Sequence, residues 1–331
     1  MMTVAFTICS NNFLAQAKTA LESLQQQHPE IKTVIFLVDI ADEAIDYRYF
    51  SPADVIVVDE KIVAGFMELV HRYTIMELNS AVRPFVIRHL QQSYPGISRL
   101  YYIDPDMYVY DRFDHLDQLL EKEDILITPH FLQPIPVDGL RPFENLALNF
   151  GTYNLGFLAL NPSTENVNTF LDWWGERTRQ FSHIDLQNGY FTDQIWFNLV
   201  PIFFKRVYTI RHPGYNMAIW NLHERKISSC DEQGKIMLES GDPLVIYHFS
   251  SWDYFNPRQL SREHNRYQLA QRPDLEKLYA DYHAALIKNR IEFFYTIPCR
   301  LPYNKKIIRR SPLQKVLSPV VNLMRKVWKK I

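Results

Sequence analysis

Short apolar runs alternate along the chain with segments whose apolar residues recur every three or four positions. Apolar runs bounded by polar residues predict buried strands, whereas the longer spacing predicts amphipathic helices. The expected strands are 3–8, 33–38, 54–58, 100–103, 125–128, 150–160 and 244–248. The expected helices are 14–24, 73–92, 166–179 and one that opens at 191–196. This alternation predicts an α/β protein with a mostly parallel sheet flanked by helices and a site at its carboxyl edge.

Two details refine the helical segments. Pro84 lies inside the second expected helix and marks a break or a new helix start there. Thr192 precedes the last expected helix and suits its N-cap position. The stretch 129–142 carries four prolines, and we expect it to form a loop or lid over the site.

The pattern predicts one continuous domain, 1–302, followed by a tail, 303–331. A chain of 331 residues is long enough for two domains, but no internal repeat or low-complexity linker divides it. The hydrophobic content of 47% and the aromatic content of 14% are ample for one large core.

Composition excludes several kinds of chemistry. Only 10 glycines are present, and neither a G-x-G-x-x-G nor a G-x-x-x-x-G-K-[ST] motif occurs, which argues against dinucleotide and P-loop sites. Three distant cysteines offer no disulfide framework or zinc spacing and suit a reducing compartment. Because no signal peptide or run of ~20 apolar residues is found, we expect a cytoplasmic protein.

The tail differs sharply in charge from the rest. Nine of the 36 basic residues and none of the 37 acidic ones lie in 303–331, so the body is acidic and the tail strongly basic. Apolar residues from Leu313 to Ile331 follow helical spacing, with Pro312 at a first helical position and Pro319 as a kink. A basic amphipathic helix is typical of an anchor on an anionic membrane, here the inner face of the cytoplasmic membrane. The alternative is a helix docked on the core or on a second subunit, and the oligomeric state stays open.

Because an acidic body repels the phosphate backbone of nucleic acids, no nucleic-acid partner is expected. The most informative stretch of the body is Asp104-Pro-Asp106, which follows the strand 100–103. Pro105 disturbs the alternation of side chains, so the two carboxylates can converge beyond the end of the strand. With His248 at the end of 244–248 and at the same sheet edge, they form a set that suits Mn²⁺ or Mg²⁺ on a diphosphate. The alternatives are an acidic turn and a structural histidine.

Five elements in chain order resemble the nucleotide-sugar glycosyltransferases of the Rossmann-like GT-A fold. They are Arg83-Pro84, Asp104-x-Asp106, Asn154-Leu155-Gly156-Phe157, Asp193-Gln194 and His248. The pattern is most similar to retaining enzymes of the family 8 type and to related bacterial polysaccharide-assembly transferases. The resemblance covers about residues 3–256.

The resemblance implies a metal and a donor. Asp104, Asp106 and His248 would hold Mn²⁺, or Mg²⁺, on the diphosphate of a nucleotide sugar, expected to be UDP-linked. Four residues at the ends of the first two strands would contact uridine or another nucleoside: Thr7, Cys9, Asn11 and Asp39.

The resemblance also implies a sugar pocket. Arg83 would reach the diphosphate or the donor sugar, and Asn154 would line the pocket. Asp193 and Gln194 would lie beside the anomeric carbon. From the residues alone, Arg83 is equally a surface cation, and Asp193 an acid that compensates a helix dipole.

One motif departs from the family. In the family, a glycine and a lysine that clamp the phosphates usually follow the histidine that corresponds to His248. In this chain, His248 is followed by Phe249-Ser-Ser-Trp252. A serine hydroxyl or Arg258 would have to substitute. An aromatic and amide cluster, Tyr215-Asn216 and Trp220 to His223, suits sugar hydroxyls on the acceptor side.

The expected function is transfer of a hexose to a glycan or lipid-linked acceptor in bacterial surface polysaccharide synthesis, such as O-antigen or capsule. A bound divalent ion stabilises the leaving diphosphate as a Lewis acid. A retaining enzyme needs no dedicated base, whereas an inverting one would use Asp193; both remain open. A sugar-1-phosphate nucleotidyltransferase is an alternative, although Ser10 to Phe13 lack the glycine- and arginine-rich loop it needs. A non-catalytic scaffold of the same fold is another.

Overall fold

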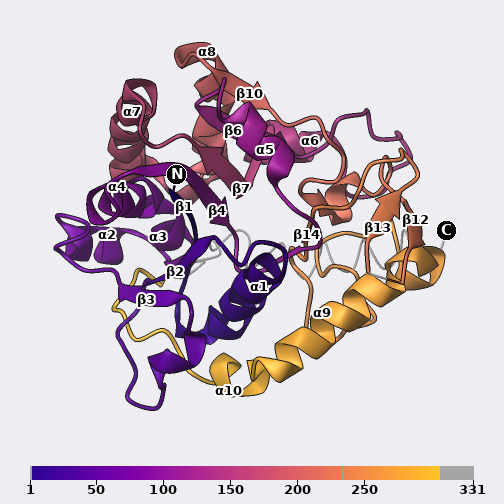
Figure 1. Ribbon diagram of the computed structural model, residues 1–331, viewed down its shortest axis with the longest axis horizontal. Coiled ribbons are helices and arrows are strands. Elements are labelled where there is room, and N and C mark those ends of the chain that lie inside the picture. The colour runs from indigo at the N-terminus through magenta and orange to yellow at the C-terminus, as the bar shows by residue number, and fades with distance from the viewer. Residues whose placement is uncertain (1, 233, 306–331) are drawn as a thin grey trace, which may run out of the picture.

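The computed structural model describes residues 2–232 and 234–305. A seven-stranded sheet runs through the molecule (Figure 1). In spatial order its strands are β10 (Val207–Thr209), β6 (Ile125–Pro129), β7 (Tyr153–Leu160), β4 (Ile97–Ile103), β1 (Met2–Cys9), β2 (Lys32–Leu37) and β3 (Asp54–Val57). Only β7 runs against its two neighbours, so the mostly parallel sheet predicted from the sequence is confirmed.

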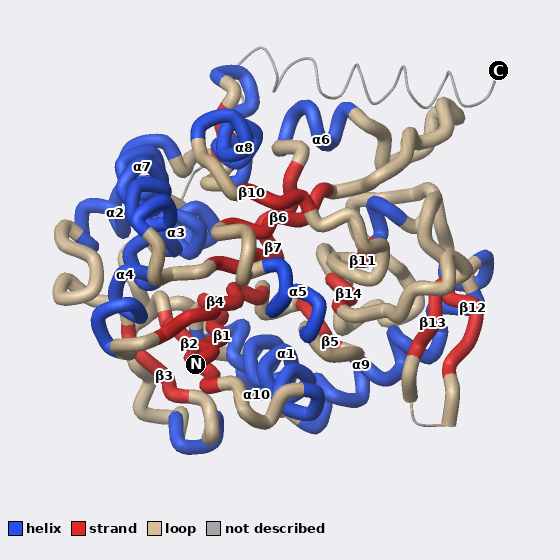
Figure 2. The backbone as a smooth tube through the Cα atoms, turned by 45° about the horizontal axis from the view of Figure 1, so that its top comes forward, coloured by secondary structure: helices blue, strands red, loops and turns tan. Residues whose placement is uncertain are grey.

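The two faces of the sheet carry different helices, as Figure 2 shows. Val4, Phe6 and Ile8 of β1 face one core, and Ala5 and Cys9 face the other, as the two-residue period of a strand requires. The first face packs against α2 (Phe66–Arg72), α3 (Ile75–Ala81), α4 (Arg83–Ser93) and α7 (Glu165–Phe181). The second packs against α1 (Leu14–Gln27) and α5 (Asp114–Leu119).

Beyond the central sheet, the described residues form three small sheets. One consists of β11 (Met217–Ala218), β14 (Ile246–His248) and β5 (Met107–Val109). The other two are the pairs β12 (Ile227–Cys230) with β13 (Ile236–Leu238) and β8 (Ile184–Asp185) with β9 (Tyr190–Phe191).

The helices that complete the described chain are short except for one. Two of them, α6 (Asn145–Phe150) and α8 (Val200–Phe203), flank the part of the sheet around β7 and β10. The other two, α9 (Glu276–Lys288) and α10 (Ile291–Tyr295), pack against α1, and Figure 1 shows α9 lying along the edge of the molecule.

His248 does not end a strand of the central sheet, which corrects the expectation of one shared sheet edge, although it meets Asp106 at the edge of a small sheet. β14 pairs with β5 in the small sheet, where His248 lies opposite Met107. The central sheet ends at Asp104, whose N–H donates to the carbonyl of Gly156 at 2.7 Å. After the turn that contains Pro105, the chain joins a different partner strand, so the histidine reaches the carboxylates from a second sheet.

Local boundaries also differ from the prediction, most clearly at two places. The strand expected at 150–160 begins at Tyr153, because α6 continues to Phe150 and Gly151 (φ 109°) turns the chain. The helix expected from Thr192 is a 3-10 helix, Gln194–Leu199, and Thr192 has a left-handed backbone (φ 47°). In contrast, Pro84 does open a new helix, α4.

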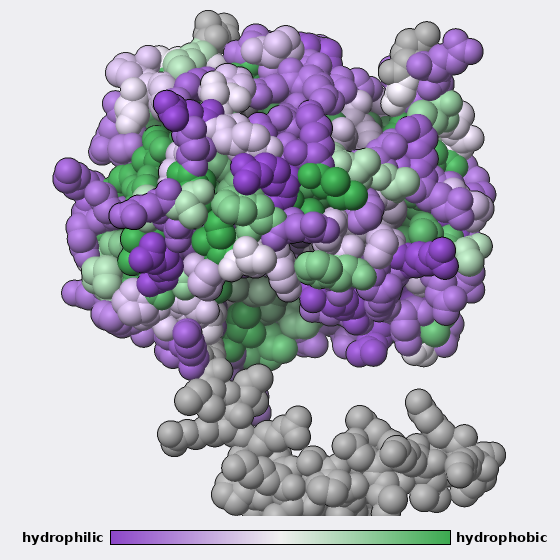
Figure 3. Space-filling model, turned by 90° about the horizontal axis from the view of Figure 1, so that it is seen from below, coloured by the Kyte–Doolittle hydropathy of each residue, from purple (hydrophilic) through white to green (hydrophobic). Residues whose placement is uncertain are grey.

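The predicted tail helix lies outside the described residues. The chain is described as far as Lys305, and Asn304 holds it by donating to the carbonyls of Tyr73 and Arg72 at 2.9 and 3.1 Å. None of the helices within the described ranges combines the length and apolar character that crossing a bilayer requires. The face seen in Figure 3 is largely hydrophilic, with apolar residues in separate patches.

Candidate active site

The structure brings together the three residues predicted as metal ligands. One ligand atom from each of Asp104, Asp106 and His248 lies within 4.8 Å of the others. The His248 Nε2 lies 3.1 Å from Oδ1 of Asp106 and 3.9 Å from Oδ2 of Asp104. Asp104 follows β4, Asp106 precedes β5 and His248 ends β14, so three strand ends converge on one point.

This donor set fits a divalent cation such as Mn²⁺ or Mg²⁺. Two carboxylates supply hard oxygen ligands and the imidazole supplies a nitrogen. The backbone is shaped around the imidazole: a Cβ on Gly156 would lie 2.7 Å from Cε1 of His248 and 2.6 Å from Cε of Met107. Only glycine at this position in β7 therefore lets the ring occupy its place.

Charge within the cluster is strongly coupled. Burial raises the pKa of Asp104, and the Asp106 carboxylate adds to this effect. Burial alone would also raise the pKa of Asp106, but the imidazole of His248 outweighs it and holds that pKa below its ordinary value. Burial disfavours the charged imidazole, yet the carboxylate of Asp106 outweighs it and raises the pKa of His248. Two acids facing one imidazole provide negative charge that a cation neutralises.

Arg83 belongs to this buried region and is not a surface cation. Its guanidinium donates to Oδ2 of Asp193 at 2.9 Å and to Oδ1 of Asp104 at 3.4 Å. It also donates to the hydroxyl of Tyr102 at 3.1 Å, and that hydroxyl donates in turn to Asp104. The arginine therefore joins the candidate metal site of Asp104, Asp106 and His248 to Asp193.

Asp193 is almost fully buried, at 1% exposure. Burial raises its pKa to about 6, against the attraction of the Arg83 guanidinium. Its second oxygen, Oδ1, has no hydrogen-bond partner among the described residues. Asp193 directly precedes the 3-10 helix that begins at Gln194, and its side chain makes no capping hydrogen bond. Helix capping therefore does not explain why this acid is buried.

Asn154 and Gln194 are also brought to this region. Both are nearly buried, at 8% and 9% exposure. Oε1 of Gln194 accepts from the N–H of Leu155 at 3.1 Å and from Nδ2 of Asn154 at 3.3 Å, and its Nε2 donates to the carbonyl of Phe150 at 2.8 Å. These amides are therefore tied to β7 and to each other.

The four residues predicted to contact a nucleoside meet at the carboxyl ends of β1 and β2, but they are buried. They are Thr7, Cys9, Asn11 and Asp39, with exposures from 0 to 2%. Asp39 accepts from the N–H of Asn11 at 3.1 Å and from the N–H of Arg300 at 2.8 Å. Burial raises the pKa of the Cys9 thiol, which makes it an inert group. Arg300 thus brings the C-terminal segment across this strand edge.

Most of the aromatic and amide cluster predicted for the acceptor side is buried, and its acceptor role stays a prediction. Exposures are 4% or less at Tyr215, Asn216, Trp220 and Asn221. Trp220 contacts the His248 ring edge-on, with 5.1 Å between ring centroids. Asn216 lies against the same imidazole. Sequence reasoning missed this supporting role because no local pattern connects residue 216 with 248.

The loop 129–142 is tied to the segment that follows β14. Arg266, at 8% exposure, donates to Asp138 at 2.5 Å and to the carbonyls of Pro136, Leu140 and Pro142. The two loops that leave β6 and β14 are therefore joined. Arg258, predicted to replace the missing lysine, is exposed and has no hydrogen bond or ion pair with another described residue. Its phosphate role stays a prediction.

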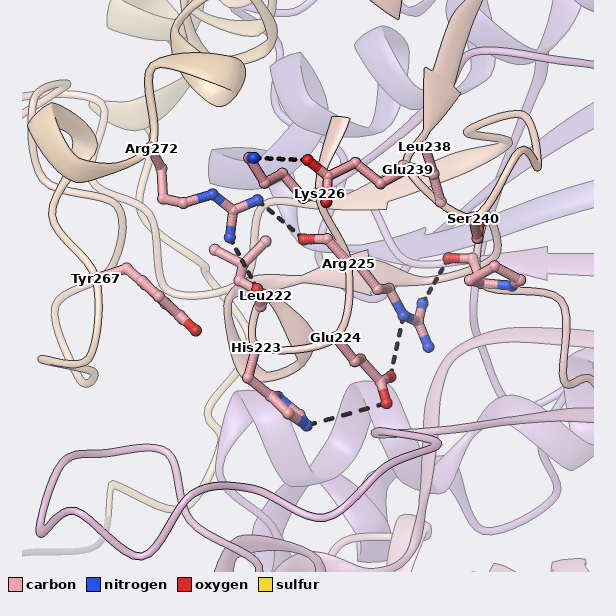
Figure 4. A pocket seen from close by; sticks show the side chains of 11 residues that line it. Leu222, His223, Glu224, Arg225, Lys226, Leu238, Glu239, Ser240, Tyr267 and Arg272 are labelled. Atoms are coloured by element: carbon pink, nitrogen blue, oxygen red, sulfur yellow. Dashed lines mark hydrogen bonds and ion pairs between the residues drawn. The ribbon is translucent and has the colours of Figure 1, made fainter. Parts of the chain in front are cut away.

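A cavity of about 300 Å³ lies beside residues 222–226 and β13 (Figure 4). Two buried arginines form part of its wall. Arg272 donates to the carbonyls of Leu222 and Arg225, and Arg225 donates to the carbonyls of Pro213 and Tyr215. Their hydrogen-bonding capacity is largely used within the chain, so the wall is a structural network, and none of the metal-cluster residues lines it.

No family model matches the chain. Among curated proteins, the uncharacterized protein YfnF of Bacillus subtilis (strain 168) is 26% identical over 275 residues, which cover 80% of this chain and 86% of YfnF. A solved structure of an active-site mutant of LgtC is 15% identical and covers 86% of this chain and 96% of LgtC, with a TM-score of 0.50. The glycosyltransferase GlyE of Streptococcus pneumoniae TIGR4 is also 15% identical, covering 91% of this chain and 66% of GlyE, with a TM-score of 0.49.

The likeness to LgtC, itself a galactosyltransferase, spans nearly the whole of that protein. In this chain the central sheet is mixed: the parallel strands β3, β2, β1 and β4 are followed in space by the antiparallel β7. The chain therefore has the GT-A fold that its sequence motifs predict.

Proposed function

We propose that this protein is a metal-dependent glycosyltransferase that moves a hexose from a UDP-sugar to a glycan or lipid-linked acceptor. The observation that carries the proposal is the convergence of Asp104, Asp106 and His248 at the end of β4 in a GT-A fold. Two carboxylates and an imidazole suit Mn²⁺ or Mg²⁺, and such an ion suits the diphosphate of a donor.

The proposed mechanism follows from where charge develops. When the bond between sugar and phosphate breaks, the diphosphate gains negative charge and the sugar gains positive charge. Asp104, Asp106 and His248 would hold a divalent ion, which would supply Lewis-acid stabilisation of the leaving group. Arg83 adds a fixed positive charge beside Asp104, 3.4 Å away, so the cation side of the site is preorganised.

The sugar side is assigned to Asp193, with Gln194 and Asn154. Asp193 keeps one oxygen free of hydrogen bonds within the described chain and lies on the far side of Arg83 from Asp104. It would face the anomeric carbon and stabilise the positive charge there. We propose a retaining reaction, in which the leaving phosphate accepts the proton of the acceptor hydroxyl and no separate base is needed.

The nucleoside is assigned to the carboxyl edge of β1 and β2. Thr7, Cys9, Asn11 and Asp39 shape this edge, and backbone groups at the end of β1 would contact the uracil and ribose. The product would be a bacterial surface polysaccharide assembled at the inner face of the cytoplasmic membrane, where the basic tail attaches the protein.

The first experiment measures UDP release from UDP-hexoses with and without Mn²⁺. Asp104→Asn and Asp106→Asn should each lower the rate at least about 100-fold, because metal stabilisation of the leaving group supplies several kcal/mol. Calorimetry should show that UDP binding to the wild type requires the metal.

The matched control is Asp172→Asn, which removes a surface carboxylate that pairs with Arg88 at 2.6 Å. It should leave the rate unchanged. Thermal melts verify that all variants are folded. Full activity in both Asp104 and Asp106 variants would show that the metal assignment is wrong.

A further inference from the structure

We propose that Asn216 is a positioning residue that fixes the orientation of His248 toward the metal site. It is the last member of a chain of three buried amides that begins at Gln194. This inference rests on the proposed function and deepens it, because it explains how the metal cluster is joined to the sugar side of the site.

Backbone groups fix the direction of the first amide. Nε2 of Gln194 faces the carbonyl of Phe150 at 2.8 Å, and a carbonyl can only accept. Oε1 of Gln194 faces the N–H of Leu155 at 3.1 Å, and an N–H can only donate. The oxygen and nitrogen of this side chain therefore cannot be exchanged.

The second amide is fixed in the same way. Oδ1 of Asn154 accepts from the N–H of Gly156 at 3.0 Å, so its Nδ2 must be the group that donates to Gln194 at 3.3 Å. The same oxygen also faces the third amide, Asn216, at 2.9 Å. Because that oxygen is an acceptor, the facing atom of Asn216 must be its nitrogen.

The orientation of the Asn216 amide decides which ring nitrogen of His248 carries a hydrogen. Nδ2 of Asn216 also donates to Oγ1 of Thr128 at 3.1 Å, while the Thr128 hydroxyl itself donates to the carbonyl of Asn154. Oδ1 of Asn216 therefore faces Nδ1 of His248 at 3.2 Å as an acceptor. Nδ1 must carry a hydrogen, which leaves Nε2 as the ring nitrogen directed at Asp106 and Asp104.

The backbone at Asn216 is held rigidly for this task. Its φ of 53° is left-handed, a conformation that asparagine tolerates better than most residues. Nδ2 of Asn221 donates to its carbonyl at 3.0 Å, and Asn216 is fully buried. Trp220 and Gly156 enclose the ring of His248 from the other sides. The imidazole thus has one orientation available.

The amide chain also assigns a role to Gln194. Its oxygen already accepts two hydrogen bonds, so both acceptor positions are occupied. Gln194 therefore acts through Asn154 and Asn216 on the metal ligand, while Asp193 beside it keeps a free oxygen for the sugar. Partners of metal-bound histidines commonly set ligand orientation and affinity in this manner.

The test is Mn²⁺ binding to the metal-free full chain, measured from the free Mn²⁺ signal in electron paramagnetic resonance. Asn216→Gly keeps the left-handed backbone and removes the acceptor, and it should raise the Kd for Mn²⁺ about 10- to 100-fold. Asn216→Asp keeps an oxygen that faces Nδ1 but loses the donor to Asn154 and Thr128, so its Kd should lie between those of Asn216→Gly and the wild type.

The matched control is Asn289→Ala, which removes a buried amide that donates to Thr19 and Glu22, both on α1. It should leave the Kd unchanged. Wild-type affinity in a folded Asn216→Gly variant, or equal weakness of Asn216→Asp, would overturn the positioning role. A wild type that does not bind Mn²⁺ would instead contradict the proposed function itself.

A second measurement does not depend on the Asn216 variants. Two-bond ¹H–¹⁵N spectra of the histidine-labelled wild type, with the His248 signal identified from its loss in His248→Gln, report which nitrogen carries hydrogen. Hydrogen on Nδ1 supports the amide chain, and a ring without hydrogen on Nδ1 rules it out.

Discussion

At the scale of single residues, the candidate site holds charged groups that are buried away from water. Arg83 is 8% exposed and Asp193 is 1% exposed, yet they form an ion pair at 2.9 Å. Removing one partner of a buried pair leaves the other charge without compensation. Arg83 also contacts Asp104 at 3.4 Å, so this pair connects the two acids of the site.

His130 provides a residue-scale prediction about pH. Burial lowers its pKa to about 4, below the value of 6.5 expected in the unfolded chain. The unfolded chain therefore binds more protons between pH 6.5 and 4, and the free energy of unfolding falls as the pH drops through this window. The loss attributable to His130 approaches about 3 kcal/mol at pH 4. We expect His130→Gln to lose less stability than the wild type between pH 7 and 4.5, as measured by urea denaturation.

The comparison for this prediction is His71→Gln, which removes an exposed histidine of α2. Its pH dependence of unfolding should match that of the wild type. Parallel curves for the wild type and His130→Gln would show that His130 does not resist protonation in the folded protein.

At the scale of elements, one arginine joins the start of α9 to residues 222–225. Arg272 precedes α9 and is 6% exposed. Besides the carbonyls of Leu222 and Arg225, it donates to both oxygens of Asp274, at 2.8 Å each. The helix that it positions presents Tyr282, whose ring stacks on Phe249 with 3.8 Å between centroids. Phe249 directly follows His248, so the start of α9 is linked to the metal cluster.

We therefore expect Arg272→Ala to lower the free energy of unfolding by about 3 kcal/mol, because it leaves Asp274 and two carbonyls without their partner. Urea denaturation measures this loss. The control is Arg48→Ala, whose pair with Asp46 is exposed on both sides and which should change stability little. Equal stability of the two variants would contradict the role assigned to Arg272.

At the scale of the whole molecule, positive charge is concentrated at one end of the chain. The nine basic residues of 303–331 leave 27 basic and 37 acidic residues in the body. Such a body is repelled by an anionic membrane, so attachment would depend on the tail alone.

The corresponding prediction concerns vesicles. Removal of 311–331 should abolish sedimentation with vesicles that contain anionic lipid, and added salt should weaken binding of the full chain. Vesicles of neutral lipid serve as the control and should bind neither protein. Unchanged binding after the removal would show that the tail does not act as the anchor.

Local sequence patterns were sufficient for the features that depend on neighbouring residues. Strands, helices and the new helix start at Pro84 follow from the spacing of apolar residues and from the fixed φ of proline. Asp104 and Asp106 were recognisable because both lie within one short motif at the end of a strand. The order of motifs along the chain also predicted the GT-A fold, which the likeness to LgtC supports.

Tertiary structure decided the features that join distant parts of the chain. His248 comes from a separate small sheet, and Asn216 reaches it although the two residues are 32 positions apart. The predicted acceptor cluster became a buried support, because the polar groups of Asn216 and Asn221 are satisfied inside the protein. In the sequence, an asparagine looks the same whether its amide binds a sugar or another amide. Only the packed structure shows which partner it has, since burial makes a hydrogen bond obligatory wherever water is excluded.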